Sequence, residues 1–217
     1  MSARERMLAR IRARQGKPLE PSDAEREAVR SHIAAHGRSP GPRDAWDALT
    51  RFRERALSLA STIDEAVDVS AVPASVARYL TERGLPMRAV CWRELAGLDW
   101  TRSGASIEVR AARDDDLIGI TGAFCGISET GTLMTLSAAD RPPSVSLLPE
   151  THIAVLSQSR IVRSMEDAWA LYRAEHRALP RAVNFISGPS RTADIEQTVT
   201  LGAHGPYRVH IILVARP

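Results

Sequence analysis

Apolar residues recur at helical spacing through the first third of the chain and mostly in short strand-like runs after it. In a helix that packs on one side, apolar side chains return every three or four residues. Three stretches have this pattern: residues 3–14, 21–37 and 43–63. The sequence therefore predicts a helical N-terminal extension over residues 1–63, which could serve as the contact of a homo-oligomer.

The rest of the chain, residues 64–217, has the pattern of an α/β domain. A strand at 67–69, a helix at 74–83 and a strand at 89–92 follow one another in the order of a parallel βαβ unit. The apolar run 211–214 has no polar position, which is typical of a strand buried on both faces. We expect a central, mostly parallel sheet with flanking helices. Further strands are predicted at 117–124, 132–137, 144–148, 153–157, 183–186 and 209–214, with helices at 165–178 and about 192–199.

The charge distribution and the lengths of the apolar runs indicate which binding partners and which cellular location to expect. The net charge is only +3 at pH 7, and the N-terminal arginines alternate with acidic residues, so nucleic-acid binding is not expected. No apolar run is long enough to span a membrane, and the arginines at the N-terminus precede no continuous apolar segment of a secretory signal. We therefore expect a cytoplasmic protein.

Lysine and cysteine usage excludes several mechanisms. Lys17 is the one lysine, and it lies in a polar stretch beside Gly16 and Pro18. Schiff-base, pyridoxal-phosphate and P-loop chemistry all need a lysine within the site, so none of them is expected. Cys91 and Cys125 are isolated in sequence, which predicts two buried, inert thiols and neither a disulfide nor a complete iron–sulfur site.

Two further patterns are compatible with metal binding but are more simply explained without it. His32 and His36 lie four residues apart on a predicted helix, without the glutamate that follows the first histidine in a zincin. The three consecutive carboxylates at 114–116 precede a strand, where acidic residues usually mark a solvated turn. We expect no metal site.

Three polar segments between apolar strands are the strongest functional signal. Glycine, hydroxyl and charged residues concentrated at the end of a strand are typical of loops that hold a small anion. We therefore look for function in these three loops, and we expect them to meet in one pocket at the carboxyl ends of the central strands. They are Ser128-Glu129-Thr130-Gly131-Thr132, Ser187-Gly188-Pro189-Ser190-Arg191-Thr192-Ala193-Asp194-Ile195-Glu196 and Gly202-Ala203-His204-Gly205-Pro206.

Glu129 stands among hydroxyl residues and next to a flexible backbone. A carboxylate in such a place can act as a base or nucleophile, and partial burial would raise its pKa toward the range suited to proton transfer. An equally good interpretation is a turn in which Glu129 accepts backbone N–H groups and Gly131 supplies a positive φ. His204, between small residues, is a candidate acid–base group or polar contact, and His152 is a weaker one because it begins a strand.

The second loop has the composition of an anion site at the start of a helix. Gly188 turns the chain after a strand, Ser190 or Thr192 can cap the helix that follows, and the helix dipole then favours an anion. Arg191 adds a forked guanidinium suited to a carboxylate or phosphate. Alternatively, these residues only cap the helix while Arg191 pairs with Asp194 or Glu196.

The order of these motifs resembles that of the lactate-utilisation (LUD) domain family, in particular its small stand-alone members. The resemblance covers roughly residues 67–214. It rests on Gly119-Ile120-Thr121, on the three loops above, and on Arg141 with Leu147-Leu148-Pro149 and His152-Ile153.

The resemblance implies a fold of the sugar-phosphate isomerase and CoA-transferase type, and a role beside two iron–sulfur proteins in oxidising L-lactate to pyruvate. Larger family members carry cluster-binding cysteines that are absent here. No cofactor is therefore expected in this chain, and electron transfer is expected to belong to the partner proteins.

Two hypotheses for the function follow. In the first, the chain is a non-redox subunit that binds a small carboxylate or other organic anion in the loops around Glu129, Arg191 and His204. In the second, it is an autonomous isomerase or acyl- or CoA-transferase-like enzyme with Glu129 as base or nucleophile. The candidate catalytic residues are Glu129 and His204, and the candidate ligand-binding residues are Thr130, Gly131, Thr132, Arg141, Gly188, Ser190, Arg191, Thr192 and Asp194.

Overall fold

A computed structural model describes residues 2–18, 20–38, 40–41, 45–192, 200–202 and 204–216. The chain forms two compact units, Met1–Arg43 and Asp44–Pro217. The helix α3 (Ala48–Ser58), which the sequence pattern groups with the N-terminal extension, lies in the second unit. The reason is packing, because α3 buries Phe52 and Ala56 completely in a core of that unit.

The N-terminal unit contains two helices, α1 (Ala3–Arg14) and α2 (Asp23–Ala35), as predicted. Each begins with a capping box, formed by Ser2 with Glu5 and by Ser22 with Glu25. In each box the serine hydroxyl accepts the backbone N–H of the glutamate, and the glutamate carboxylate accepts the backbone N–H of the serine. Neither helix has a buried residue. In the described part of the chain, no helix is long and apolar enough to cross a membrane.

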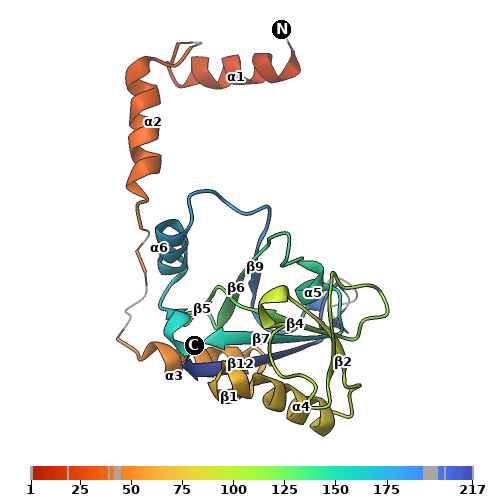
Figure 1. Ribbon diagram of the computed structural model, residues 1–217. Helices are drawn as coiled ribbons and strands as arrows, with labels where there is room; N and C mark the ends of the chain where they lie inside the picture. The colour runs from red at the N-terminus through yellow and green to blue at the C-terminus, as the bar shows by residue number, and fades with distance from the viewer. Residues whose placement is uncertain are drawn as a thin grey trace. The chain divides into compact units, whose positions relative to one another are not determined.

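The second unit is built on a six-stranded, entirely parallel sheet with the strand order β1-β12-β7-β4-β2-β3 (Figure 1). This confirms the predicted α/β class. The helix α4 (Val72–Glu82) joins β1 to β2 as a βαβ connection, but β12, β7 and β4 lie between these two strands. The strands are β1 (Thr62–Asp68), β2 (Arg88–Cys91), β3 (Ser106–Val109), β4 (Ile118–Gly122), β7 (Thr151–Ser157) and β12 (Arg208–Arg216).

A second, four-stranded sheet of order β8-β5-β6-β9 was not evident from the sequence. Its strands are β5 (Cys125–Ile127), β6 (Thr132–Leu136), β8 (Ile161–Val162) and β9 (Val183–Ile186). The strand predicted at 117–124 is β4, and the hairpin of β5 and β6 follows it almost directly in the chain. Helix α6 (Met165–Glu175) packs on this sheet through Ala168 and Tyr172.

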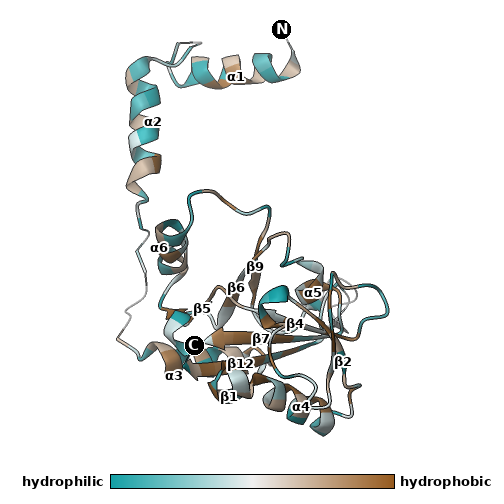
Figure 2. Cartoon of the chain, viewed as in Figure 1, coloured by the Kyte–Doolittle hydropathy of each residue, from teal (hydrophilic) through white to brown (hydrophobic). Residues whose placement is uncertain are grey.

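Two cores lie on opposite faces of the large sheet. Ile153 and Val155 of β7 face a core shared with α4, whereas Ala154 and Leu156 face a core shared with α3 and Leu133 of the four-stranded sheet. The central strands of the large sheet are accordingly hydrophobic along most of their length (Figure 2). The double burial predicted from the apolar run 211–214 is confirmed.

Two local predictions differ from the structure. Residues 144–148, predicted as a strand, contain the short helix α5 (Ser144–Leu147). Proline is well tolerated where a helix begins, and Pro142 and Pro143 precede α5, so the alternation of serine with apolar residues is a misleading strand signal.

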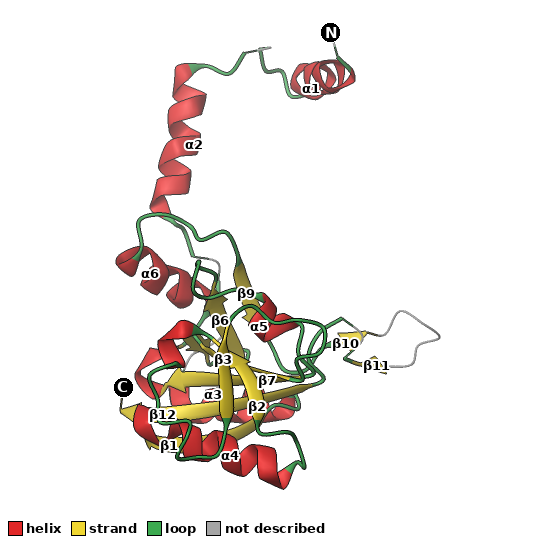
Figure 3. Cartoon of the chain, turned by 45° about the vertical axis from the view of Figure 1, so that its right-hand side comes forward, coloured by secondary structure: helices red, strands yellow, loops and turns green. Residues whose placement is uncertain are grey.

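The second difference lies in the loop after β9. The helix predicted from about Thr192 starts in a strand, because β10 (Arg191–Thr192) pairs antiparallel with β11 (Thr200–Leu201) (Figure 3). Residues 193–199 lie outside the described residues.

Two histidines are buried within the large sheet. A ring nitrogen of His152 (Nε2) lies 2.8 Å from Thr121 Oγ1, and Nδ1 of His210 lies 2.8 Å from Thr62 Oγ1. His210 also stacks on Tyr79, with the ring centroids 3.9 Å apart. Burial lowers the pKa of each from 6.5 to about 4, because an imidazolium ion is disfavoured away from water.

We predict that these histidines make the fold acid-sensitive. Below pH 6.5 an unfolded chain binds protons at both residues, whereas the folded chain does so only near pH 4, so stability falls as the pH falls through this window. Each histidine should contribute about 3 kcal/mol to the decline. Urea unfolding between pH 8 and 4.5 should show a shallower decline for His152→Gln and for His210→Gln than for the wild type, and equal slopes would contradict the assignment.

Candidate functional site

The structure brings two of the predicted loops together through a chain of hydroxyl groups. Thr132 Oγ1 lies 2.7 Å from Thr130 Oγ1 and 2.7 Å from Ser187 Oγ. Thr132 begins β6 and Ser187 follows β9, and these strands are antiparallel neighbours, with Leu133 opposite Ile186. Thr132 is buried, whereas Thr130 and Ser187 are exposed, so both ends of the hydroxyl chain reach solvent.

Both loops lie against the C-terminal end of α3. A Cβ on Gly131 would be 2.5 Å from the backbone nitrogen of Ala56, and one on Gly188 would be 2.3 Å from the carbonyl oxygen of Leu59. The φ angles of the two glycines are +70° and +78°, a conformation that other residues rarely adopt. The positive φ expected at Gly131 is therefore observed, and both glycines are required by close packing.

Arg191 lies at the same helix end. Its Nη2 group donates a hydrogen bond of 3.1 Å to the carbonyl oxygen of Leu59, the residue that caps α3. A cation is favourable there because the C-terminal end of a helix carries partial negative charge. The side chain is exposed. The side chain of Thr192 and the whole of Asp194 lie outside the described residues.

The third loop joins the first two through the backbone of Ser190. The N–H of Ser190 donates to the carbonyl oxygen of Pro206 (2.8 Å), and its own carbonyl oxygen accepts the N–H of Gly202 (2.9 Å). His204 lies in this loop and is exposed. We call the described residues of 128–132, 187–191 and 202–206 the polar loop cluster.

The cluster lies at the amino-terminal ends of the parallel strands, so the expectation that these loops meet at the carboxyl ends is wrong. Leu59 precedes β1, and Pro206 precedes β12. The carboxyl-end rule concerns loops that follow parallel strands. Here the first two loops belong to the four-stranded sheet, which lies across one face of the large sheet.

Glu129 is half-buried at the turn between β5 and β6. Its backbone N–H donates to the carbonyl oxygen of Arg163 (3.0 Å). The neighbouring Ser128 hydroxyl accepts a hydrogen bond from Trp46 Nε1 (3.3 Å) and donates to the same Arg163 carbonyl (3.3 Å). On the other side of Glu129, the N–H of Gly131 donates to the carbonyl oxygen of Ile127 (2.9 Å), so the turn is fixed on both sides. Within the described residues, the Glu129 carboxylate makes no side-chain hydrogen bond.

Arg141 is not part of the cluster. It lies beyond the carboxyl end of β2, where its Nε is 3.9 Å from Asp140 and its charge acts on Glu94. The Glu94 carboxyl group lies directly over Gly122, where a Cβ would be 1.8 Å from its oxygen. Partial removal from water, together with Asp140, raises the pKa of Glu94, while Arg141 lowers it. No sequence motif marks Glu94, which follows β2 in a short 3-10 turn.

The remaining ionisable candidates have structural surroundings. Both cysteines are buried and free, and burial raises the pKa of Cys91 to about 11 and of Cys125 to about 12. Asp116 of the acidic run is paired with both terminal nitrogens of Arg110, at 2.5 and 2.8 Å. Among the residues that the structure describes, no group of three or more His, Cys, Asp or Glu side chains could hold a metal ion.

Comparison with known proteins adds a family assignment to this geometry. Residues 62–214 match the model of the LUD domain. This range begins with β1 and includes both sheets and all three polar loops.

Several curated relatives are named "Lactate utilization protein C". The chain is 34% identical over 119 residues to the one from Bacillus licheniformis, which covers 54% of this chain and 49% of the relative. It is 36% identical to the one from Bacillus subtilis, over 54% of this chain and 50% of the relative. It is 38% identical to the one from Exiguobacterium sp. over 144 residues, which cover 64% of this chain and 61% of the relative. The chain thus spans about half the length of most of the curated relatives it matches.

A solved structure has the same fold. The crystal structure of a DUF162 family protein from Deinococcus radiodurans is similar to this chain with a TM-score of 0.57 at 25% sequence identity. The match covers 77% of this chain and 96% of that protein.

We predict that Gly131→Ala destabilises the protein by about 1–3 kcal/mol, because the new Cβ has a strained φ and meets the α3 backbone. The matched control is Gly97→Ala, where φ is ordinary and no atom lies within 4 Å. Urea unfolding of both variants is the measurement. If the two variants unfold at the same urea concentration, the turn is not held tightly against α3.

Proposed function

Because the chain belongs to the LUD domain family, we propose that it acts in lactate utilisation, as a non-redox subunit of a system that oxidises L-lactate to pyruvate. The names of its relatives support the pathway. In this proposal two iron–sulfur proteins are the redox partners, and this chain contributes a binding site for a small organic anion.

The observation that carries the anion site is the hydroxyl chain Thr130–Thr132–Ser187, which joins two loops distant in sequence next to the same end of α3. Each hydroxyl group can donate one hydrogen bond and accept others, so the exposed ends of the chain can orient donors toward a bound carboxylate. Thr132, buried in the middle, holds the two ends in place.

Arg191 supplies the positive charge. One N–H of its guanidinium is used by the Leu59 carbonyl, which holds the side chain in position and leaves the rest of the planar fork for a ligand. Ser190 ties this segment to the loop of His204. Glu129 and His204 are the groups of the cluster that can accept a proton from a bound hydroxy acid.

The cysteines support an assignment of electron transfer to the partners. Cys91 packs in the core beside α4, and Cys125 packs between the four-stranded sheet and α6. Buried thiols with raised pKa values are poor sources of the thiolate that cluster iron requires.

We predict that Arg191→Ala weakens binding of the small carboxylate by about ten- to hundredfold, because it removes a charge-assisted hydrogen bond. Stability should fall by less than about 1 kcal/mol, since only the contact with the end of α3 is lost. Arg191→Lys should restore binding only partly, because an ammonium group cannot form the two-pronged contact. Arg181→Ala, an exposed arginine just before β9, is the control.

The measurements are titration calorimetry with L-lactate and pyruvate, and growth on lactate of a strain that lacks the native gene and carries each variant. Unchanged binding and growth in Arg191→Ala would overturn the anion site. Turnover of an acyl-CoA or a phosphosugar by the pure chain, lost in Glu129→Gln, would instead establish the alternative of an autonomous transferase or isomerase.

A further inference from the structure

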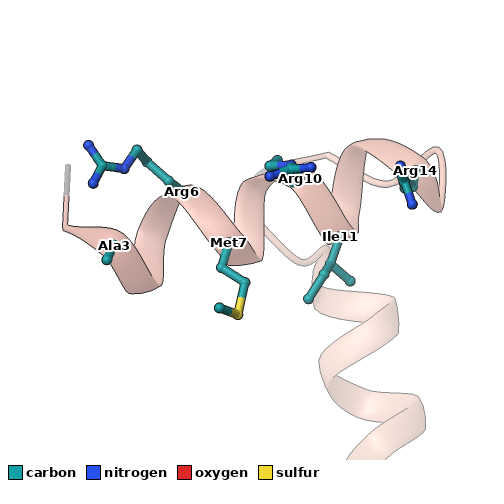
Figure 4. Close-up of a pocket in the computed structure, with 6 residues that line it drawn as sticks. All are labelled: Ala3, Arg6, Met7, Arg10, Ile11 and Arg14. Carbon is teal, nitrogen blue, oxygen red and sulfur yellow. The ribbon is translucent and has the colours of Figure 1, made fainter.

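Helix α1 carries an apolar row that no described residue of the N-terminal unit buries. Met7 is 64% exposed and Ile11 is 46% exposed, although both are large apolar side chains. They lie four residues apart, and Ala3 continues the row by one more turn of the helix. Figure 4 shows Met7 and Ile11 projecting from the same side of α1.

A row of arginines borders these apolar residues. Arg6, Arg10 and Arg14 also follow one another at four-residue steps, and together with Ala3, Met7 and Ile11 they line one shallow groove on the helix (Figure 4). No ion pair is recorded between these three arginines and any residue in the described part of the chain. The groove therefore presents three guanidinium groups beside an apolar strip.

The N-terminal unit is strongly basic, whereas the rest of the chain is slightly acidic. Helix α1 contains five arginines and one glutamate. Over residues 1–43 there are ten basic and five acidic residues, whereas residues 44–217 have nineteen basic and twenty-one acidic residues. The complementary partner for α1 is thus strongly acidic.

Helix α1 carries stabilising groups at both of its ends. Its capping box satisfies backbone N–H groups at the first turn, and Arg12 and Arg14 lie in the last turn, where cations are favourable. A capped helix with apolar anchors at i and i+4 is the form in which helices enter the groove of a partner protein. Arginine is also enriched among residues that contribute most to protein–protein binding.

The size of the apolar strip favours a protein over a membrane. Helices that lie in a bilayer interface bury a broad apolar face, usually with aromatic residues. Helix α1 spans 12 residues and has no aromatic side chain. The strip of Ala3, Met7 and Ile11, with Leu8 (48% exposed) on its adjoining side, is narrow and suits a groove between protein helices.

We propose that α1 is a docking helix for an acidic protein surface, with Met7 and Ile11 in a narrow apolar groove and Arg6, Arg10 and Arg14 paired with carboxylates at its rim. The proposal rests on the proposed function in one respect, since the surface is assigned to one of the iron–sulfur partner proteins.

The test measures the Kd between the full chain and the two iron–sulfur proteins of the proposed system, each purified separately. The variant Arg6→Gln/Arg10→Gln/Arg14→Gln removes the groove arginines, and the control Arg4→Gln/Arg12→Gln removes two arginines from the same helix that do not line the groove. A second variant, Met7→Gln/Ile11→Gln, removes the apolar anchors. Because none of these residues is buried, all variants should unfold at the wild-type urea concentration.

We expect Kd to rise at least tenfold for the triple arginine variant and for the anchor variant, and less than threefold for the control. The wild-type Kd should also rise with salt concentration, and this dependence should weaken in the triple variant. If the wild type binds the partners but the triple variant binds equally well, the docking helix is wrong and the proposed function stands. If the wild type binds neither partner, the proposed function itself fails.

Two competing occupants are tested with the same variants. Vesicles containing phosphatidylserine should not retain the wild-type chain, and retention that depends on the groove arginines would overturn the proposal in favour of a membrane. Sedimentation of the chain alone should give the same mass for wild type and triple variant. A dimer that only the wild type forms would assign the groove to a second copy.

Discussion

The double burial of β7 and β12 is the constraint on which the rest of the second unit depends. Successive side chains of a strand point to opposite faces, so Ile153 and Ala154 must face different cores. A register shift of one residue would move each set of side chains to the opposite face of the sheet, and neither core could then pack. The parallel pairing of β1, β12, β7 and β4 is therefore strongly determined, and it leaves two apolar faces to be covered.

The two faces are covered by different kinds of structure, and the difference creates the candidate site. Helix α4 covers one face, whereas α3 and the four-stranded sheet share the other. Because Phe52 and Leu133 contact the same core, the hairpin of β5 and β6 is held beside α3. Gly131 and Gly188 then allow two loops to approach the α3 backbone more closely than a side chain would permit. The polar loop cluster is thus a consequence of how one face of the sheet is closed.

The N-terminal unit is stabilised in a different way. No side chain of α1 or α2 is buried, so these helices depend on capping, on local pairs such as Lys17 with Glu25 (3.0 Å), and on helix propensity. The exposed apolar residues of α1 bury no surface within the N-terminal unit, which is why we assign them to a partner. The second unit thus holds the polar loop cluster, and the N-terminal unit holds the basic helix α1.

The sequence by itself determined the α/β class, the N-terminal helices and the three polar loops, because apolar periodicity, capping serines and glycine-rich turns are local signals. It did not determine which loops meet or at which edge of the sheet. The hydrogen bond between Thr132 and Ser187 joins residues 55 positions apart, and that between Arg191 and Leu59 joins residues 132 positions apart. Such contacts leave no periodic pattern in either segment. Only the packing of the second sheet against α3 decided that Arg191 lies with the hydroxyl chain while Arg141 lies beyond the opposite ends of the strands.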